Sequence, residues 1–108
     1  MPRPSDIKNQ NLREMMIASQ QAIRRGDFTA SVRHSAEAVR QLLLLRPDAL
    51  NPAISARPRR VLPPIVGVRL VVQNVPEPQL VFDREHFVMA EALTWYEYAL
   101  ENIVIAEP

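Results

Sequence analysis

The sequence predicts an all-α domain, folded as an antiparallel up-and-down helical bundle. Apolar residues recur at steps of three and four over about 6–25, 28–45 and 83–105, the spacing that places them on one side of an α-helix. Gly26 and Asp27 leave only a very short connection between the first two segments, which forces them into a helical hairpin. The chain of 108 residues is long enough for one domain with a modest core.

The first helix is expected from Asp6 to Arg25, with Ser5 and Asp6 as candidate caps. Gly26 suits the position after this helix, because a residue without a Cβ can take a positive φ. The expected inner face consists of Leu12, Met15, Met16, Ser19, Ala22 and Ile23.

The second helix is expected over 28–45. Asp27 can accept hydrogen bonds from the free amides of its first turn, and Pro47 disfavours a helical conformation at Arg46. Its inner face is expected to be Phe28, Val32, Ser35, Val39, Leu42 and Leu43. The four leucines 42–45 exceed what one apolar stripe needs, so this end should be buried on two sides, by the domain or by a second copy of it.

Within this single domain, 1–108, residues 46–64 are predicted to form a long proline-rich loop. Arg57, Arg59 and Arg60 make the loop basic. In the whole chain, too, the basic residues are concentrated toward the N-terminal part. Residues 1–60 hold 11 of the 13 basic and 5 of the 12 acidic residues, so the last part of the chain is acidic.

Residues 65–75 fit two different structures. As a strand, Val66, Val68, Leu70 and Val72 alternate with more polar residues, and a second strand near 79–82 would complete a β-hairpin. As a helix, the same segment has Pro64 in its first turn and a single apolar face. That face would consist of Ile65, Val68, Val71, Val72 and Val75.

The last helix is expected to begin at Asp83, with Glu85 in its first turn, and to end at about 103–105. Two apolar rows lie side by side on it and suggest burial on two sides. They consist of Met89, Leu93, Tyr96, Leu100 and Ile103, and of Val88, Ala92, Trp95 and Ala99.

Several function classes find no support in the residues. The chain has no cysteine, so a disulfide framework or a thiolate metal site is excluded. His34 and His86 are the only histidines and lack a ligand at metal-binding spacing, and no glycine-rich phosphate loop or serine elbow occurs. We therefore expect no metal and no cofactor. No apolar run suits a signal peptide or a membrane span, which predicts a cytoplasmic protein without a membrane partner.

Gly26-Asp27-Phe28, followed by Ala36-Glu37-Ala38-Val39-Arg40-Gln41-Leu42-Leu43, resembles the second helix of HEPN-type domains. The resemblance implies a dimeric up-and-down bundle that partners a nucleotidyltransferase in toxin–antitoxin or defence systems. It also favours the helix for 65–75. The predicted fold class is therefore a HEPN-like all-α bundle. The alternative is an α+β fold with a helical hairpin, a β-hairpin at about 65–82 and a long C-terminal helix.

Ribonuclease members of the HEPN family carry an arginine followed, after four to six intervening residues, by a histidine, and this chain lacks that motif. Upstream of His86, residues 79–81 are Gln, Leu and Val, and upstream of His34, residues 27–29 are Asp, Phe and Thr. Catalysis is therefore not carried over. The stretch from Gly26 to Pro47 also resembles the second half of a tetratricopeptide unit, although no second copy is visible.

Three functional hypotheses follow. The first is a non-catalytic binding or regulatory module that forms a homodimer and binds a second protein. Its candidate interface residues are Leu42, Leu43, Leu45, Trp95 and Tyr96. The second is RNA or other nucleic-acid binding through Arg57, Arg59 and Arg60. The third is a ribonuclease with a rearranged site around Arg84 and His86.

Overall fold

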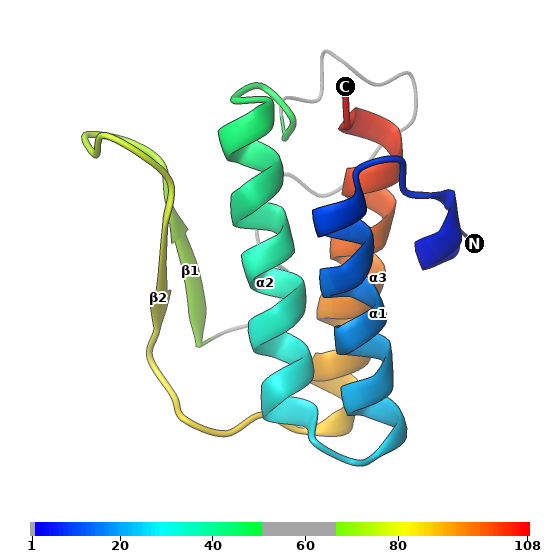
Figure 1. Cartoon of the computed structure of the whole chain (residues 1–108). Helices are drawn as coiled ribbons and strands as arrows, with labels where there is room; N and C mark the ends of the chain where they lie inside the picture. The colour runs from blue at the N-terminus through cyan, green and yellow to red at the C-terminus, as the bar shows by residue number, and fades with distance from the viewer. Residues whose placement is uncertain (1, 51–66) are drawn as a thin grey trace.

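A computed structural model describes residues 2–50 and 67–108 of the chain. Three helices lie side by side, and a β-hairpin stands against the second helix on the side opposite the first (Figure 1). In the helical layer α1 packs on α2, and α3 packs on both. The elements are a 3₁₀ turn η1 (Pro4–Asp6), α1 (Gln10–Arg24), α2 (Phe28–Leu45), β1 (Val68–Val71), β2 (Gln79–Phe82) and α3 (Met89–Ala106).

The turn between α1 and α2 has the predicted form. Gly26 adopts a φ of 79°. Its amide donates to the carbonyl of Ile23 at 3.0 Å, and the amide of Asp27 donates to the carbonyl of Ala22 at 2.8 Å, which together close a Schellman motif. The Asp27 carboxylate then caps α2 by accepting from the amide of Ala30 at 3.1 Å. One dipeptide thus ends the first helix and begins the second.

The predicted start of the first helix at Asp6 is wrong. Residues 4–6 form the separate turn η1, and α1 begins at Gln10 with Asn9 as its cap, accepting from the Leu12 amide at 2.9 Å. The break lies at Ile7 and Asn9, whose extended backbone has ψ angles of 127° and 122°. The Glu107 carboxylate, at the other end of the chain, binds this segment by accepting from the amides of Lys8 at 2.6 Å and Asn9 at 3.1 Å.

The predicted start of the last helix at Asp83 is also wrong, because α3 begins at Met89. The amide of Asp83 donates to the carbonyl of Gly67 at 2.8 Å, and the amide of Phe87 donates to Oγ1 of Thr29 at 3.1 Å. These bonds hold residues 83–88 against the hairpin and α2, so the chain cannot close a helical turn there.

Residues 68–82 decide between the two predicted folds. For the described part of 65–75, which begins at Gly67, the predicted helix is wrong, and with it the all-α bundle, because β1 and β2 form a two-stranded antiparallel sheet. The α+β alternative is the one observed in the residues that the structure describes. The register pairs Val68 with Phe82 and Leu70 with Leu80, and these four side chains pack on the helical core. Such cross-strand pairs stabilise a sheet. A helix over the same residues would not pair Val68 and Leu70 with Phe82 and Leu80.

The core lies where the three helices meet. Trp95 is fully buried, with its ring edge-on to Tyr98 at a centroid separation of 5.3 Å. Small buried residues on α2 allow its neighbours to approach closely. Ser19 of α1, for example, donates to the carbonyl of Ser31 at 3.0 Å. The predicted inner faces of α1 and α2 are confirmed, because nine of their twelve residues are buried and the other three, Met15, Ile23 and Phe28, are partly buried and packed against the core.

Gly67 provides a test of the hairpin's attachment. It adopts a φ of 103°, and a Cβ there would collide with the guanidinium of Arg84, which is ion-paired with Glu91 at the start of α3. We predict that Gly67→Ala lowers the free energy of unfolding by more than the ~1–2 kcal/mol that a left-handed residue costs. Urea unfolding followed by circular dichroism measures this difference.

Gly26→Ala is the matched control, because Gly26 also has a positive φ but has open space where its Cβ would be. Arg84→Ala in the Gly67→Ala background should recover the part of the loss that the collision causes. An equal loss for the two glycine variants would contradict the predicted close approach.

Candidate functional site

The α2–hairpin seam is the surface where one face of α2 meets β2 and the β1–β2 loop. Arg33, Glu37, Arg40 and Leu44 recur at helical spacing on α2, and β2 runs past them from the loop end toward Phe82. The seam therefore has its loop end at Leu44 and its other end at Arg33. Along the seam, residues of α2 contact residues of the hairpin that are far away in the sequence.

Arg40 is the polar centre of the seam. Its guanidinium donates to the Glu37 carboxylate, with Nε–Oε1 and Nη2–Oε2 both 2.9 Å apart. Its Nη1 donates to the main-chain carbonyl of Pro78 at 3.3 Å. Gln41 adds a further bond to Glu37 at 2.8 Å. Arg40 thus ties the helix to the first residue before β2.

Aromatic rings and guanidinium groups stack at the other end of the seam. Arg33 lies over the ring of Phe82 at 4.6 Å, and Phe82 meets Phe87 edge-on with centroids 6.5 Å apart. Arg84 lies over Phe87 at 4.7 Å while pairing with Glu91. Cation–π contacts of this kind fix the aromatic rings without burying the charges.

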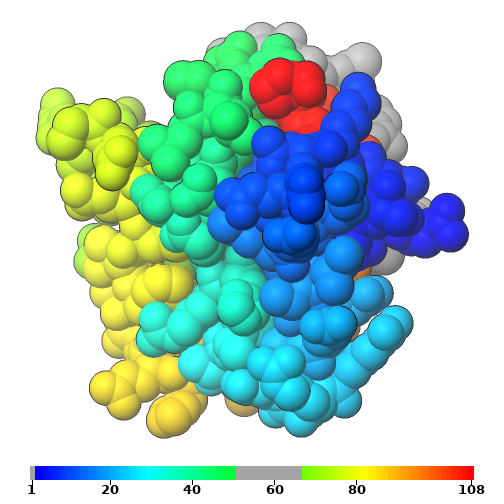
Figure 2. Space-filling view, viewed as in Figure 1, coloured from blue at the N-terminus to red at the C-terminus, as the bar shows by residue number. Residues whose placement is uncertain are grey.

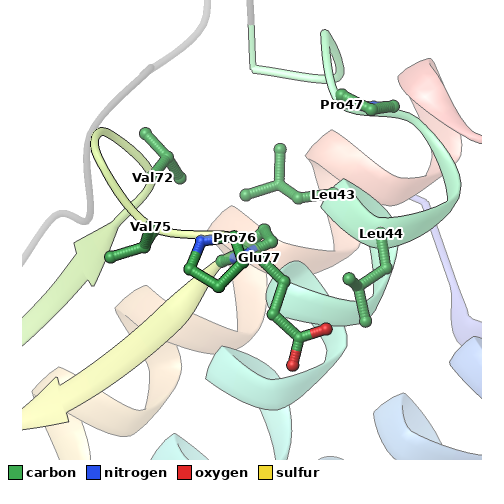
Figure 3. A pocket seen from close by; sticks show the side chains of 8 residues that line it. Leu43, Leu44, Pro47, Val72, Val75, Pro76 and Glu77 are labelled. Atoms are coloured by element: carbon green, nitrogen blue, oxygen red, sulfur yellow. The ribbon is translucent and has the colours of Figure 1, made fainter.

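Two hollows open along the seam, on either side of Pro78. The first has a volume of about 330 Å³ and lies at the loop end, where apolar residues of α2 face the loop (Figure 3). Its lining consists of Leu43, Leu44, Pro47, Val72, Val75, Pro76, Glu77 and Pro78. The second, of about 360 Å³, lies between α2 and β2 and is lined by Glu37, Arg40, Glu77, Pro78, Gln79, Leu80 and Phe82. Glu77 and Pro78 belong to both.

The charges along the seam differ in how far they are neutralised. The hydrogen bond from Arg40 lowers the pKa of Glu37, with smaller contributions from Gln41 and the Arg40 charge, while partial burial opposes the shift. The same pair raises the pKa of Arg40. Glu77, in contrast, forms no ion pair within the described part of the chain. The Glu77 charge also contributes to the raised pKa of Arg40, though less than Glu37 does. The seam therefore offers a carboxylate without an ion pair of its own between two hollows.

The predicted interface residues are mostly inside the protein. Leu42 and Trp95 have an exposed fraction of 0%, Leu43 of 4% and Tyr96 of 8%, whereas Leu45 is 50% exposed. Burial also raises the pKa of Tyr96. The apolar excess seen in the sequence is therefore largely covered within one chain, and Leu45 is the candidate that remains open to a partner.

The other predicted sites are the basic loop and the pair Arg84 and His86. Arg57, Arg59 and Arg60 lie outside the described residues, so nucleic-acid binding through them stays a prediction. Arg84 is engaged by Glu91 and Phe87, while His86 is exposed. Across residues 2–50 and 67–108, no group of three or more metal-binding side chains occurs, and no helix has the length and apolar character that a membrane crossing requires.

Three members of the two apolar rows predicted for the last helix are not buried, and they form an exposed strip at the start of α3. Val88, Met89 and Leu93 are 61%, 54% and 39% exposed. Met89 and Leu93 are one helical turn apart and so share a face. We call these three residues the α3 strip. The sequence contained the signal, because the predicted apolar arc of this helix was wider than a single contact surface covers.

Comparison with known proteins adds no assignment. The chain matches no protein-family model, no curated protein and no solved structure. Functional argument therefore rests on the seam and the α3 strip.

The Glu37–Arg40 pair leads to a pH-dependent prediction. A carboxyl group whose pKa is lower in the folded state contributes stability above its unfolded pKa, ordinarily 4.5, and loses that contribution as the pH falls through the folded pKa. We predict that Glu37→Gln lowers the free energy of unfolding by up to about 1 kcal/mol at pH 7. The difference from the unaltered protein should be smaller at pH 3, because the contribution decreases as the pH falls below 4.5.

Urea unfolding at both pH values measures this effect. Glu85→Gln is the control, because Glu85 is exposed and lies away from the seam. A loss for Glu37→Gln of the same size at pH 3 as at pH 7 would show that the carboxylate charge does not stabilise the seam.

Proposed function

We propose that this protein is a non-catalytic binding module that forms a homodimer and attaches to another protein. The observation that carries the proposal is the exposed α3 strip. Large apolar side chains gathered on a helix surface are a common feature of protein interfaces.

The two surfaces suit two different contacts. The α3 strip lies at the start of α3, whereas Leu44 and Leu45 lie at the end of α2, where Leu44 lines the apolar hollow. A helix face such as the α3 strip suits an isologous contact, in which each copy covers the same face of the other. The seam then stays accessible to a second protein. We assign the homodimer to the α3 strip and the partner to the seam.

The resemblance to HEPN-type domains suggests which partner to test first. The helical hairpin joined by Gly26 and Asp27 and the long last helix agree with that layout, and the β-hairpin is an addition to it. In this proposal the partner is a nucleotidyltransferase of a toxin–antitoxin or defence system, and the module regulates it by docking.

The homodimer is tested by light scattering over a dilution series. We predict a dimer for the unaltered protein and a rise of at least about tenfold in its dissociation constant for Leu93→Glu, because a carboxylate would be buried in an apolar contact. Ile17→Glu is the control, since Ile17 is 37% exposed but lies on α1. A monomer at all concentrations, or a dimer that Leu93→Glu leaves unchanged, would contradict the proposal.

The partner contact is tested by co-expression with minimal nucleotidyltransferases of the same genome, followed by purification of the complex. Leu45→Glu should abolish co-purification while leaving the dimer intact, because it places a charge at the exposed end of α2, next to Leu44, which lines the apolar hollow. The change does not touch the α3 strip. Ile17→Glu again serves as the control. Recovery of a full complex with Leu45→Glu would remove the seam as the docking surface.

A further inference from the structure

The hydrogen bond between Asp83 and Gly67 fixes which main-chain groups of the hairpin point outward. These residues are directly opposite in the register, and the Asp83 amide donates to the Gly67 carbonyl at 2.8 Å. In an antiparallel pair, hydrogen-bonded and non-hydrogen-bonded positions alternate. Gln79 and Val81 therefore bond to β1, whereas the main-chain groups of Leu80 and Phe82 point away from it.

The bond from Arg40 to Pro78 supports this assignment. Pro78 is two residues before Leu80, so its carbonyl should point to the same side, and the Arg40 guanidinium reaches it there at 3.3 Å. Among the described residues, no further hydrogen bond occupies the main chain of Leu80 or Phe82. These two residues form an open edge of β2.

Space lies beside this edge. The hollow of about 360 Å³ is lined by Leu80 and Phe82 on one side and by Glu37 and Arg40 on the other. Figure 2 shows β2 and the residues after it, in yellow, beside α2 on the visible face of the molecule. The other edge of the sheet is less accessible at its start, because Gly67 and Val68 are buried.

We propose that the β2 edge binds an extended segment of another protein as a third, main-chain-paired strand. Unpaired amide and carbonyl groups on a strand edge are complementary to another extended backbone, which is the basis of recognition by strand addition. This inference rests on the proposed binding function and names the conformation of the segment that the seam recognises.

A second copy of the chain is the alternative occupant of this edge. A two-fold pairing of β2 with β2 would set the strands about 4.8 Å apart. Because α2 packs against β2, such a pairing would also bring the two α2 helices toward each other. A thin, extended segment avoids that second contact and is the occupant that we propose.

The charges indicate what the segment carries. Glu77 lies where the two hollows meet and has no ion pair in the described part of the chain, whereas Glu37 is neutralised by Arg40. A lysine or arginine of the segment would pair with Glu77. Aliphatic side chains on either side would contact Leu80 and Pro78. The edge therefore selects an extended segment that alternates aliphatic and basic residues.

The test uses the whole protein and the peptide acetyl-Val-Lys-Val-Lys-Val-amide, with amide hydrogen exchange followed by NMR. In the free protein, the amides of Gln79 and Val81 should exchange slowly and that of Leu80 quickly. Millimolar peptide should slow the exchange of the Leu80 amide several-fold. The same peptide with its central residue N-methylated should not do so, because it has lost a main-chain donor and cannot pair closely.

Charge recognition is tested in the same experiment. Glu77→Gln should weaken the effect of the lysine peptide several-fold, and Glu85→Gln should not, because Glu85 lies outside both hollows. A Leu80 amide that is already protected in the dilute free protein would overturn the assignment of the open edge. Equal effects of the methylated and unmethylated peptides would overturn strand pairing.

The result of the peptide experiment is independent of the results for the homodimer and for the partner complex. If the lysine peptide fails to slow the Leu80 amide, strand addition is wrong even where Leu93→Glu breaks a dimer or Leu45→Glu abolishes a complex. If the peptide binds but the protein is a monomer, the homodimer is wrong and the strand-binding edge stands.

Discussion

The structure depends on the burial of α2 on three sides. Its small residues, Ser31, Ser35, Ala36 and Ala38, are buried where α1 and α3 pack against it, and its polar face carries the hairpin. One helix thus organises both the apolar core and the seam. Small side chains allow close helix approach, and close approach brings more apolar surface out of water. A larger side chain at Ser31 would separate α1 from α2 and also remove the bond from Ser19.

Sequence reasoning succeeded where the determining contacts are local. The Gly26–Asp27 turn, the end of α2 before Pro47 and the inner faces of α1 and α2 all depend on residues within a few positions of each other. It failed for 65–75, because valines spaced both two and three apart satisfy either period. The outcome there was decided by pairing with Gln79–Phe82, a partner that local periodicity does not reveal. The start of α1 was missed as well, and the segment before it is bound by Glu107 from the far end of the chain.

The candidate site was harder to anticipate than the fold. Leu42 and Trp95 are large and apolar, which makes them equally suited to an interface and to a core, and the core contains them. Arg33 and Glu37 have the spacing of a helical ion pair, yet Arg33 stacks on Phe82 and Glu37 pairs with Arg40. The hairpin explains both contacts, because Phe82 lies under Arg33 and the Pro78 carbonyl holds Arg40, the partner of Glu37. The seam therefore could not be recognised before the hairpin was placed against α2.

An isolated two-stranded hairpin is marginally stable, so its order here requires other contacts. Arg40 ties Pro78 to α2, Arg33 covers Phe82, and Thr29 accepts from the amide of Phe87 just beyond β2. The hairpin is thus fixed by α2 and does not need a third strand to stay folded. A free edge with hydrophobic side chains would ordinarily favour aggregation, and prolines and charges are the usual protection. Pro76 and Pro78 stand before β2, and α2 packs against β2, so prolines and a packed helix are both present as protection at this hairpin.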